Sequence, residues 1–140
     1  PIDEYYDFKF GNLPYRSIKF KHMTTESDTS SGHVTINYSD SSKHTRETWW
    51  HNIPGHHIQR KDLFIKTQEE PCDYKDNNYE RYYPVKTSDD RFGRIYKKYK
   101  NLKEENIEFI GRCGTYQYLD MHQVVNQSLL NVNRWIKDHE

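Results

Sequence analysis

The sequence lacks the short motifs that usually mark a nucleotide, metal or redox site. It holds no Gly-x-Gly-x-x-Gly dinucleotide fingerprint, no P-loop and no pair of cysteines at metal or redox spacing. No apolar run approaches the roughly 20 residues of a membrane span and no signal peptide is visible, so we expect no membrane insertion. The first residues, PIDEYYDF, do not begin with methionine, and we interpret the chain as a segment of a longer protein.

The chain also lacks net charge and is short of apolar residues. Its 21 basic and 21 acidic residues cancel, so no overall field attracts nucleic acid, and any anion site must use one or two placed arginines. Apolar residues make up 33%, against a typical value of about 45–50%. The chain compensates with 12 tyrosines, 6 phenylalanines and 3 tryptophans. A core built of tyrosine and a core completed by a missing domain both fit this composition.

Cysteine and histidine offer little chemistry in this sequence. Cys72 and Cys113 lie far apart, so we expect free thiols in a reducing compartment and a cytoplasmic location. Four histidines cluster between residues 44 and 57, but they lack the cysteine or carboxylate partners at fixed spacing that zinc sites use. We therefore expect solvated or strand-face histidines and no metal site. The four are His44, His51, His56 and His57.

The first two thirds of the chain predict short β-strands. Apolar and polar residues alternate over Tyr15–Met23 and His33–Asp40, and the second segment implies one buried face. KHTRETWWHNI and HIQRKDLFIKTQ give two more candidates, separated by a Pro-Gly turn. Strands joined by short turns favour an antiparallel sheet, which we expect within residues 1–80.

The last third of the chain, residues 81–140, changes to a helical period. An apolar stripe with helical spacing covers Phe92–Leu102. NIEFIG (Asn106–Gly111) then predicts a short buried strand. Asp120 predicts the N-cap of a final helix, with Gln123 three residues on as in a capping box. The apolar face of that helix consists of Met121, Val124, Val125, Ser128, Leu129, Val132, Trp135 and Ile136.

Two motifs outside the last third suggest ligand contacts. Arg46 stands near Trp49 and Trp50, an arrangement that makes either a cation–π surface contact, which we favour, or an anion ligand in an aromatic cleft. RYYPV places two tyrosines before a proline, which biases Tyr83 toward an extended conformation. One ring could then fill the core while the other faces a cleft, although we favour a packing role for both.

GRCGTYQYLDMHQVV, residues 111–125, is more specific. Gly111 and Gly114 permit a positive φ or a close backbone approach. Tyr116 and Tyr118 share one face if the segment is extended. The N–H groups that begin the following helix offer a site for an anion or a carbonyl. These features indicate a backbone shaped around a ligand, although a plain strand-to-helix turn needs much the same residues.

These motifs together resemble, in register, those of the UDP-galactopyranose mutase family. GRCGTYQYLDMHQVV resembles the family's C-terminal motif, in which Gly-Arg, a Tyr-x-Tyr-like stretch and Asp-Met lead into the last helix. YYPV matches the family's Tyr-Tyr-Pro-Val, and HTR (His44–Arg46) resembles its Tyr-Thr-Arg. PIDEYYDFKFGNLPYRSIKF resembles its Gly-Pro-Ile-Asp block. The resemblance covers nearly the whole chain apart from residues 52–80.

The resemblance implies the C-terminal part of a flavoenzyme. Family members interconvert UDP-galactopyranose and UDP-galactofuranose for lipopolysaccharide and other cell-surface polysaccharides. The implied fold is α+β, with an antiparallel sheet domain (1–80) followed by a helix–strand–helix segment (81–140) that completes a Rossmann-like FAD domain. Because reduced FAD carries the chemistry in the family, we assign no catalytic residue. Because the glycine fingerprint is absent here, we expect the isolated chain to bind no FAD stably and to be inactive.

The resemblance also implies two sets of site residues. One set contacts the diphosphate of the UDP-sugar, where a guanidinium suits the charge that grows as UDP leaves. The other set lies near the flavin, at the N-terminus of the last helix. The substrate-diphosphate set is Arg46, Tyr83 and Tyr118, and the cofactor set is Arg112, Asp120 and Met121.

The sequence departs from the family pattern at several positions. Trp49 replaces a glutamate, Lys86 replaces the asparagine after Tyr-Tyr-Pro-Val, and Cys113 and Gly114 replace Leu-Ala. A relative that acts on another nucleotide sugar therefore stays open, as does a free-standing β-rich module that binds a sugar or a peptide. Besides the UDP-sugar, a homodimer of the full-length protein stays open as a partner.

Overall fold

The chain folds as two compact units of α+β structure, the fold class that the sequence predicted. The computed structural model describes residues 1–56, 62–102 and 104–139. We call residues 1–16 with 79–140 the helical unit and residues 17–78 the sheet unit, and describe each by itself. The N-terminal residues thus pack with the C-terminal segment, whereas the sequence grouped them with the sheet. The division of a longer protein into domains at residue 80 stays a prediction.

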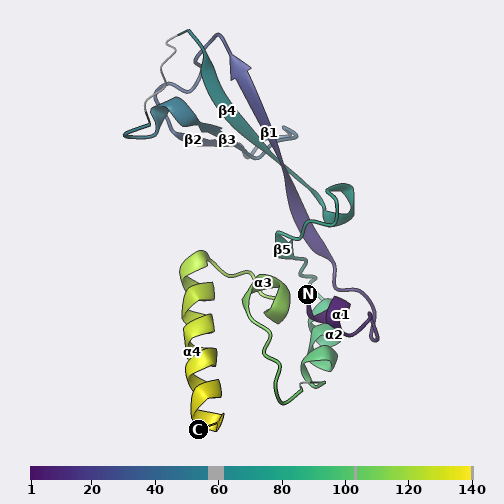
Figure 1. Ribbon diagram of the computed structural model, residues 1–140. Coiled ribbons are helices and arrows are strands. Elements are labelled where there is room, and N and C mark those ends of the chain that lie inside the picture. Colours follow the sequence, from purple (N-terminus) through teal and green to yellow (C-terminus); the bar gives the residue numbers. More distant parts are fainter. Residues whose placement is uncertain (57–61, 103, 140) are drawn as a thin grey trace. The chain divides into compact units, whose positions relative to one another are not determined.

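The strands have the order β2-β3-β4-β1-β5, and the pairs β2–β3, β3–β4 and β1–β5 are antiparallel (Figure 1). Their bounds are Tyr15–Thr25 for β1, Thr35–Asn37 for β2, Arg46–Trp49 for β3, Phe64–Asp73 for β4 and Tyr83–Pro84 for β5. Short 3-10 helices follow β3 at Trp50–Asn52 and β4 at Tyr74–Asp76.

Three of the four predicted strands are confirmed as β1, β2 and β3. The predicted alternation around β2 is also confirmed, because Val34, Ile36 and Tyr38 are half-buried while the residues between them are exposed. The fourth prediction, HIQRKDLFIKTQ, begins at His57, and residues 57–61 lie outside the described residues. Its second half lies in β4.

The helical unit has a core of tyrosines. Tyr15, Tyr99 and Tyr116 are buried, and each hydroxyl donates to backbone: to the carbonyl of Cys113 (3.2 Å), to that of Gly11 (2.8 Å) and, for Tyr116, to two loop carbonyls. Burial raises the pKa of all three phenols. A tyrosine core, one of the two outcomes that the composition allowed, is therefore confirmed for this unit. Its helices are α1 (Ile2–Tyr5), α2 (Arg91–Lys100), α3 (Gly111–Thr115) and α4 (Met121–His139).

The predicted helices α2 and α4 are confirmed, but the predicted strand at Asn106–Gly111 is wrong. Residues 106–110 form no strand and are exposed or half-buried, and Gly111 already begins α3. A strand needs a neighbouring backbone to receive its hydrogen bonds. Within the described residues, no strand lies beside this segment.

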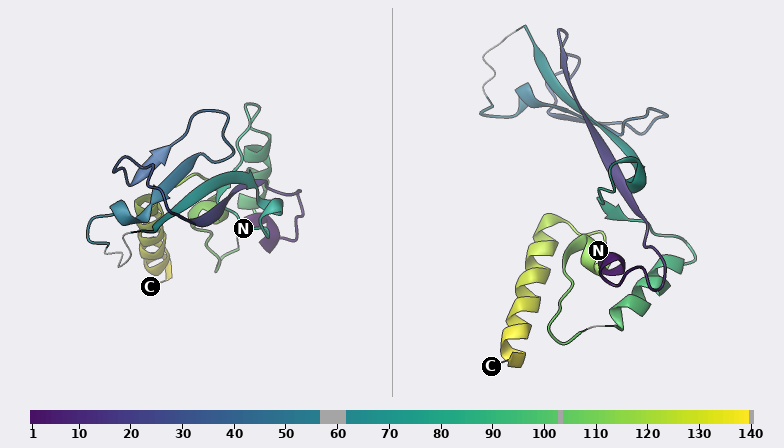
Figure 2. Two further views of the ribbon diagram at one scale, coloured as in Figure 1. Left: turned by 90° about the horizontal axis from the view of Figure 1, so that it is seen from above. Right: turned by 45° about the vertical axis from the view of Figure 1, so that its right-hand side comes forward.

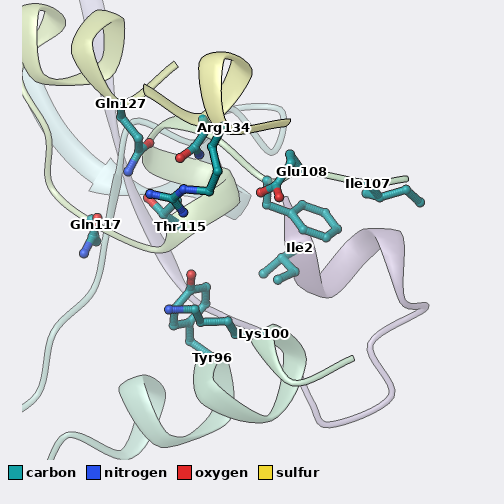
Figure 3. Close-up of a pocket in the computed structure, with 11 residues that line it drawn as sticks. Ile2, Tyr96, Lys100, Ile107, Glu108, Thr115, Gln117, Gln127 and Arg134 are labelled. Carbon is teal, nitrogen blue, oxygen red and sulfur yellow. The ribbon is translucent and has the colours of Figure 1, made fainter. Parts of the chain in front are cut away.

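Helix α4 turns mainly polar side chains toward the rest of its unit and leaves most of its apolar side chains exposed. Gln127, Asn131 and Arg134 line a cavity of about 350 Å³ that Lys100 of α2 also borders (Figure 3). The opposite side of α4 faces no other segment of the helical unit (Figures 1 and 2). Fully burying one such apolar side chain contributes about 1.5–3 kcal/mol, so this surface is costly in water. The exposed apolar side chains of α4, at 42–87%, are Met121, Val125, Leu129, Leu130, Val132, Trp135 and Ile136; of these, Met121 and Val125 border a groove with Arg112, and Val132 and Trp135 border a hollow with Ile110.

The sheet unit is organised around Trp49 and Glu47, which face the same side of β3. Trp49 is fully buried, with the Lys66 ammonium 4.8 Å from its ring centre. The buried Glu47 carboxylate accepts hydrogen bonds from Gln68 Nε2 (2.7 Å), Lys66 Nζ (2.8 Å) and Tyr38 Oη (3.0 Å). Desolvation alone would raise the pKa of Glu47, but these hydrogen bonds outweigh it and lower the pKa to about 2.

We predict that Glu47→Gln lowers the free energy of unfolding by roughly 1–3 kcal/mol at pH 7, because Lys66 loses its buried anionic partner. The lowered pKa means that Glu47 stabilises the fold above its ordinary pKa near 4.5, and this contribution is lost as the pH falls toward about 2. Urea unfolding at several pH values measures both effects.

The matched control for this experiment is Glu70→Gln, whose ion pair with Lys21 is more exposed. Such a surface pair contributes at most about 1 kcal/mol. Equal destabilisation by the two substitutions, or a Glu47→Gln effect that does not shrink between pH 5 and pH 2.5, would contradict the assigned role of Glu47.

Candidate functional site

Arg112 is the centre of the predicted site residues that contact one another in the structure. It lies in α3 directly after Gly111, whose φ of +73° turns the chain into that short helix. Its Nε donates to the carbonyl of Leu119 at 2.6 Å, and its Nη1 donates to the carbonyl of Tyr82 at 3.1 Å. Two backbone carbonyls from separate segments therefore fix the plane of this guanidinium.

Tyrosine rings surround that guanidinium. The Arg112 Cζ lies 4.7 Å from the ring centre of Tyr118 and 5.4 Å from that of Tyr82. Tyr83 meets Tyr118 edge to face, with ring centres 5.7 Å apart. We call these four residues the Arg112 cluster. It brings three predicted site residues together, namely Tyr83, Arg112 and Tyr118.

Tyr116 and Tyr118 of residues 111–125 do not share a face, because the extended segment that this required is absent. The segment is not extended, because α3 ends at Tyr116 with a left-handed backbone (φ 51°). Tyr116 turns into the core, and its single hydroxyl proton is shared between the carbonyls of Pro14 (2.9 Å) and Val85 (2.8 Å). Tyr118 is 59% exposed and is available to a ligand.

Gly111 and Gly114 are required by the local backbone geometry of the chain. Gly111 has the positive φ described above, and Gly114 lies against the backbone of Phe109, where an added Cβ would come within 3.0 Å of the carbonyl carbon. The close approach that the sequence indicated at Gly114 is therefore made to the protein's own backbone.

The predicted start of the last helix is confirmed. The backbone N–H of Asp120 donates to Gln123 Oε1 at 2.7 Å, which is one half of a capping box. Met121 and Arg112 line one open groove of about 410 Å³ at this end of α4, together with Tyr82. Two of the three residues predicted for the cofactor thus share a concave surface, while the third, Asp120, starts the helix beside it.

Arg46, the third residue predicted for the diphosphate, lies on β3 of the sheet unit. Its Nε donates to Asn37 Oδ1 at 2.9 Å, and its Nη1 lies 3.8 Å from Glu69 Oε1. The structure gives Arg46 polar neighbours on both adjacent strands. The cation–π contact that we favoured from the sequence is therefore not the environment of Arg46 within the described residues.

Sequence reasoning missed three members of these arrangements. Tyr82 was visible beside Tyr83 in YYPV, but nothing in the motif indicated that its carbonyl and ring hold Arg112. Asn37 and Glu69 lie 9 residues before and 23 residues after Arg46, and the strand register that joins them is not readable from spacing. For RYYPV, both rings are partly exposed, so neither fills the core.

The histidines and cysteines take up ordinary positions in the described part of the chain. His44 Nε2 lies 3.7 Å from Glu47, and His51 Nε2 lies 3.0 Å from Asp28. No group of three or more potential metal ligands occurs among the residues described, which exclude His57. Cys72 and Cys113 are free thiols, and burial raises the pKa of Cys113.

The chain belongs to the UDP-galactopyranose mutase family, whose model matches residues 1–118. It is 32% identical over 142 positions to the dTDP-fucopyranose mutase of Escherichia coli, covering 99% of this chain and 36% of that protein. It is 29% identical over 133 positions to the UDP-galactopyranose mutase of Mycoplasma genitalium, covering 91% and 32%.

The chain therefore spans about a third of the length of these relatives. Family membership confirms the resemblance inferred from GRCGTYQYLDM, YYPV and HTR. Among the helices of the described residues, none combines the length and the apolar character needed to cross a membrane.

We predict that Arg112→Lys lowers the free energy of unfolding by roughly 1–2 kcal/mol. A lysine keeps the charge, but it cannot donate to two carbonyls in one plane or stack on both tyrosines. Urea unfolding followed by intrinsic fluorescence measures the change. The control is Arg91→Lys, an exposed arginine over Phe92, for which we expect a change within about 0.5 kcal/mol. Equal stability of the two variants would contradict the view that the hydrogen bonds of Arg112 to the carbonyls of Leu119 and Tyr82 stabilise the fold.

Proposed function

We propose that this chain forms the C-terminal part of a flavin-dependent mutase that interconverts the pyranose and furanose forms of a nucleoside diphosphate sugar. The observation that carries the proposal is the Arg112 cluster. Arg112 lines the groove that also contains Met121, a residue predicted to contact the flavin. The Arg112 guanidinium also contacts Tyr118, which contacts Tyr83, and both tyrosines are predicted to contact the substrate. Family membership favours this function over a free-standing binding module.

The residues on the predicted flavin side fit an aromatic cofactor. The groove lined by Arg112 and Met121 has mainly apolar walls with one fixed cation, the usual composition of a cofactor pocket. The N-terminus of α4 opens beside it, where backbone N–H groups favour a carbonyl or an anion. Reduced FAD, when bound, would supply the nucleophile for the anomeric carbon of the sugar.

The chain's own residues would hold the leaving group. We assign Arg46, Tyr83 and Tyr118 to the diphosphate, because a guanidinium and phenol hydroxyls can donate to its oxygens. These donors matter most when the bond to the sugar breaks, since negative charge then grows on the diphosphate. Tyr118 is suited to this task because Arg112 and Tyr83 already hold its ring on two sides.

The apolar face of α4 supports a further part of the proposal. We propose that this face packs against the dinucleotide-binding fold of the full-length protein, which the chain does not contain. Most of the apolar side chains of α4 are exposed, and a contiguous apolar surface of this kind suits an apolar partner. By the same argument, we expect the 140-residue chain alone to hold no FAD and to be inactive.

Two sugars are candidates for the substrate. UDP-galactopyranose follows from the family model, and dTDP-fucopyranose follows from the similarity to the Escherichia coli protein. The departures at Trp49 and Lys86 are the sequence features that favour a substrate other than UDP-galactopyranose. A role in cell-surface polysaccharide synthesis in the cytoplasm, and a homodimer of the full-length protein, belong to the same proposal.

We predict that the reduced full-length protein converts at least one of UDP-galactopyranose and dTDP-fucopyranose into its furanose form, measured by chromatography of the nucleotide sugars. Arg46→Ala should lower kcat/KM by about a hundredfold, because it removes a donor aimed at developing charge. The loss of stability should stay small, since Arg46 is exposed.

Absence of furanose product from both sugars, with a reducible flavin bound, would reject the proposed function. Unchanged kinetics of Arg46→Ala would remove Arg46 from the site while leaving the function in place.

A further inference from the structure

Arg46 lies in the middle of a polar row that crosses three strands of the sheet unit. Asn37 of β2 pairs with Arg46 of β3, and Arg46 pairs with Glu69 of β4. Residues directly opposite each other in an antiparallel sheet project from the same face. The amide and the carboxylate therefore flank the guanidinium on its two sides.

The two neighbours hold Arg46 in different ways. Asn37 accepts a hydrogen bond from Nε at 2.9 Å, which fixes the plane of the guanidinium. Glu69 Oε1 lies 3.8 Å from Nη1, well beyond the roughly 2.7–2.9 Å of a charge-assisted hydrogen bond. Glu69 therefore attracts Arg46 without occupying its donors.

The exposure of the pair fits an open site. The Arg46 side chain is 49% exposed and that of Glu69 is 16% exposed. Within the described residues, the four terminal N–H groups of Arg46 make no hydrogen bond. They are therefore available for bidentate hydrogen bonding to a phosphate group. The guanidinium is thus oriented by Asn37, balanced by Glu69 and open to a ligand.

We propose that Glu69 is a positioning residue. In the ligand-free protein its carboxylate attracts the Arg46 guanidinium, and the substrate diphosphate replaces the carboxylate as the partner of Arg46 when it binds. We call this the stand-in role of Glu69. This inference rests on the proposed function, in which Arg46 binds that diphosphate. Carboxylate and phosphate use the same donors, so the two compete for one guanidinium. The negative charge of Glu69 also opposes the incoming diphosphate, so Glu69 weakens nucleotide binding and speeds nucleotide release.

The test uses the FAD-loaded full-length protein with UDP as the probe, and isothermal calorimetry as the measurement. Glu69→Gln keeps the shape of the side chain and removes its charge. We expect UDP to bind about fivefold more tightly, the factor that corresponds to one good surface ion pair. With the nucleotide sugar that the protein converts, KM should fall by a similar factor while kcat does not rise.

Glu70→Gln is the matched control, because Glu70 is the next residue of β4, projects from the opposite face and pairs with Lys21 at 2.6 Å. It should leave UDP affinity unchanged. Asn37→Ala should weaken UDP binding, because it removes the hydrogen bond that orients Arg46.

The outcomes separate this inference from the proposed function. Tighter UDP binding by Glu69→Gln alone supports the stand-in role, whereas a merely structural role for Glu69 would weaken binding. Equal or weaker binding by Glu69→Gln, in a protein whose Arg46→Ala variant has lost UDP, overturns the inference and leaves the proposed function intact. If Arg46→Ala binds UDP as the unchanged protein does, the proposed role of Arg46 fails, and the stand-in role of Glu69 fails with it.

Discussion

The arrangement of α4 is the constraint on which the account of this chain depends. A surface helix normally turns its apolar stripe toward the core. Here Gln127 and Asn131 face the helical unit, while Leu129, Leu130 and Ile136 are exposed. Burying side chains of this kind is the main favourable term in folding. The tyrosine core holds the rest of the unit together without them, so the helix is presented for a partner of apolar character.

The same helix connects the core to the candidate site. Its first turn and the preceding segment supply Leu119, Met121 and the exposed Tyr118, and Arg112 ties that segment to the carbonyl of Tyr82. The guanidinium is therefore a structural clamp and, in the proposed function, a member of the cofactor groove. An arginine with two carbonyl partners costs no reorganisation when a ligand arrives, which is the property that a preorganised site requires.

Local patterns predicted the local elements well, and failed where the answer lay in distant contacts. Helical spacing and a capping box gave α2 and α4, because those signals act within one or two turns. The strand expected at Asn106–Gly111 needs neighbouring strands that the described residues do not supply. The shared face considered for Tyr116 and Tyr118 required an extended segment, and the left-handed turn that ends α3 leaves no clear signal in the sequence. Tyr82 and Glu69 gained their importance from strand register and backbone carbonyls, neither of which a motif encodes.

The central claim is that the apolar face of α4 is buried by a part of the full-length protein that lies outside this chain. Hydrogen–deuterium exchange of peptides from residues 121–139 tests it directly, in the 140-residue chain and in the full-length protein, with peptides from α2 as the internal control. We expect the α4 amides to exchange much more slowly in the full-length protein, while the α2 amides, anchored by the buried Tyr99, change far less. Equal protection of α4 in both proteins would contradict the account.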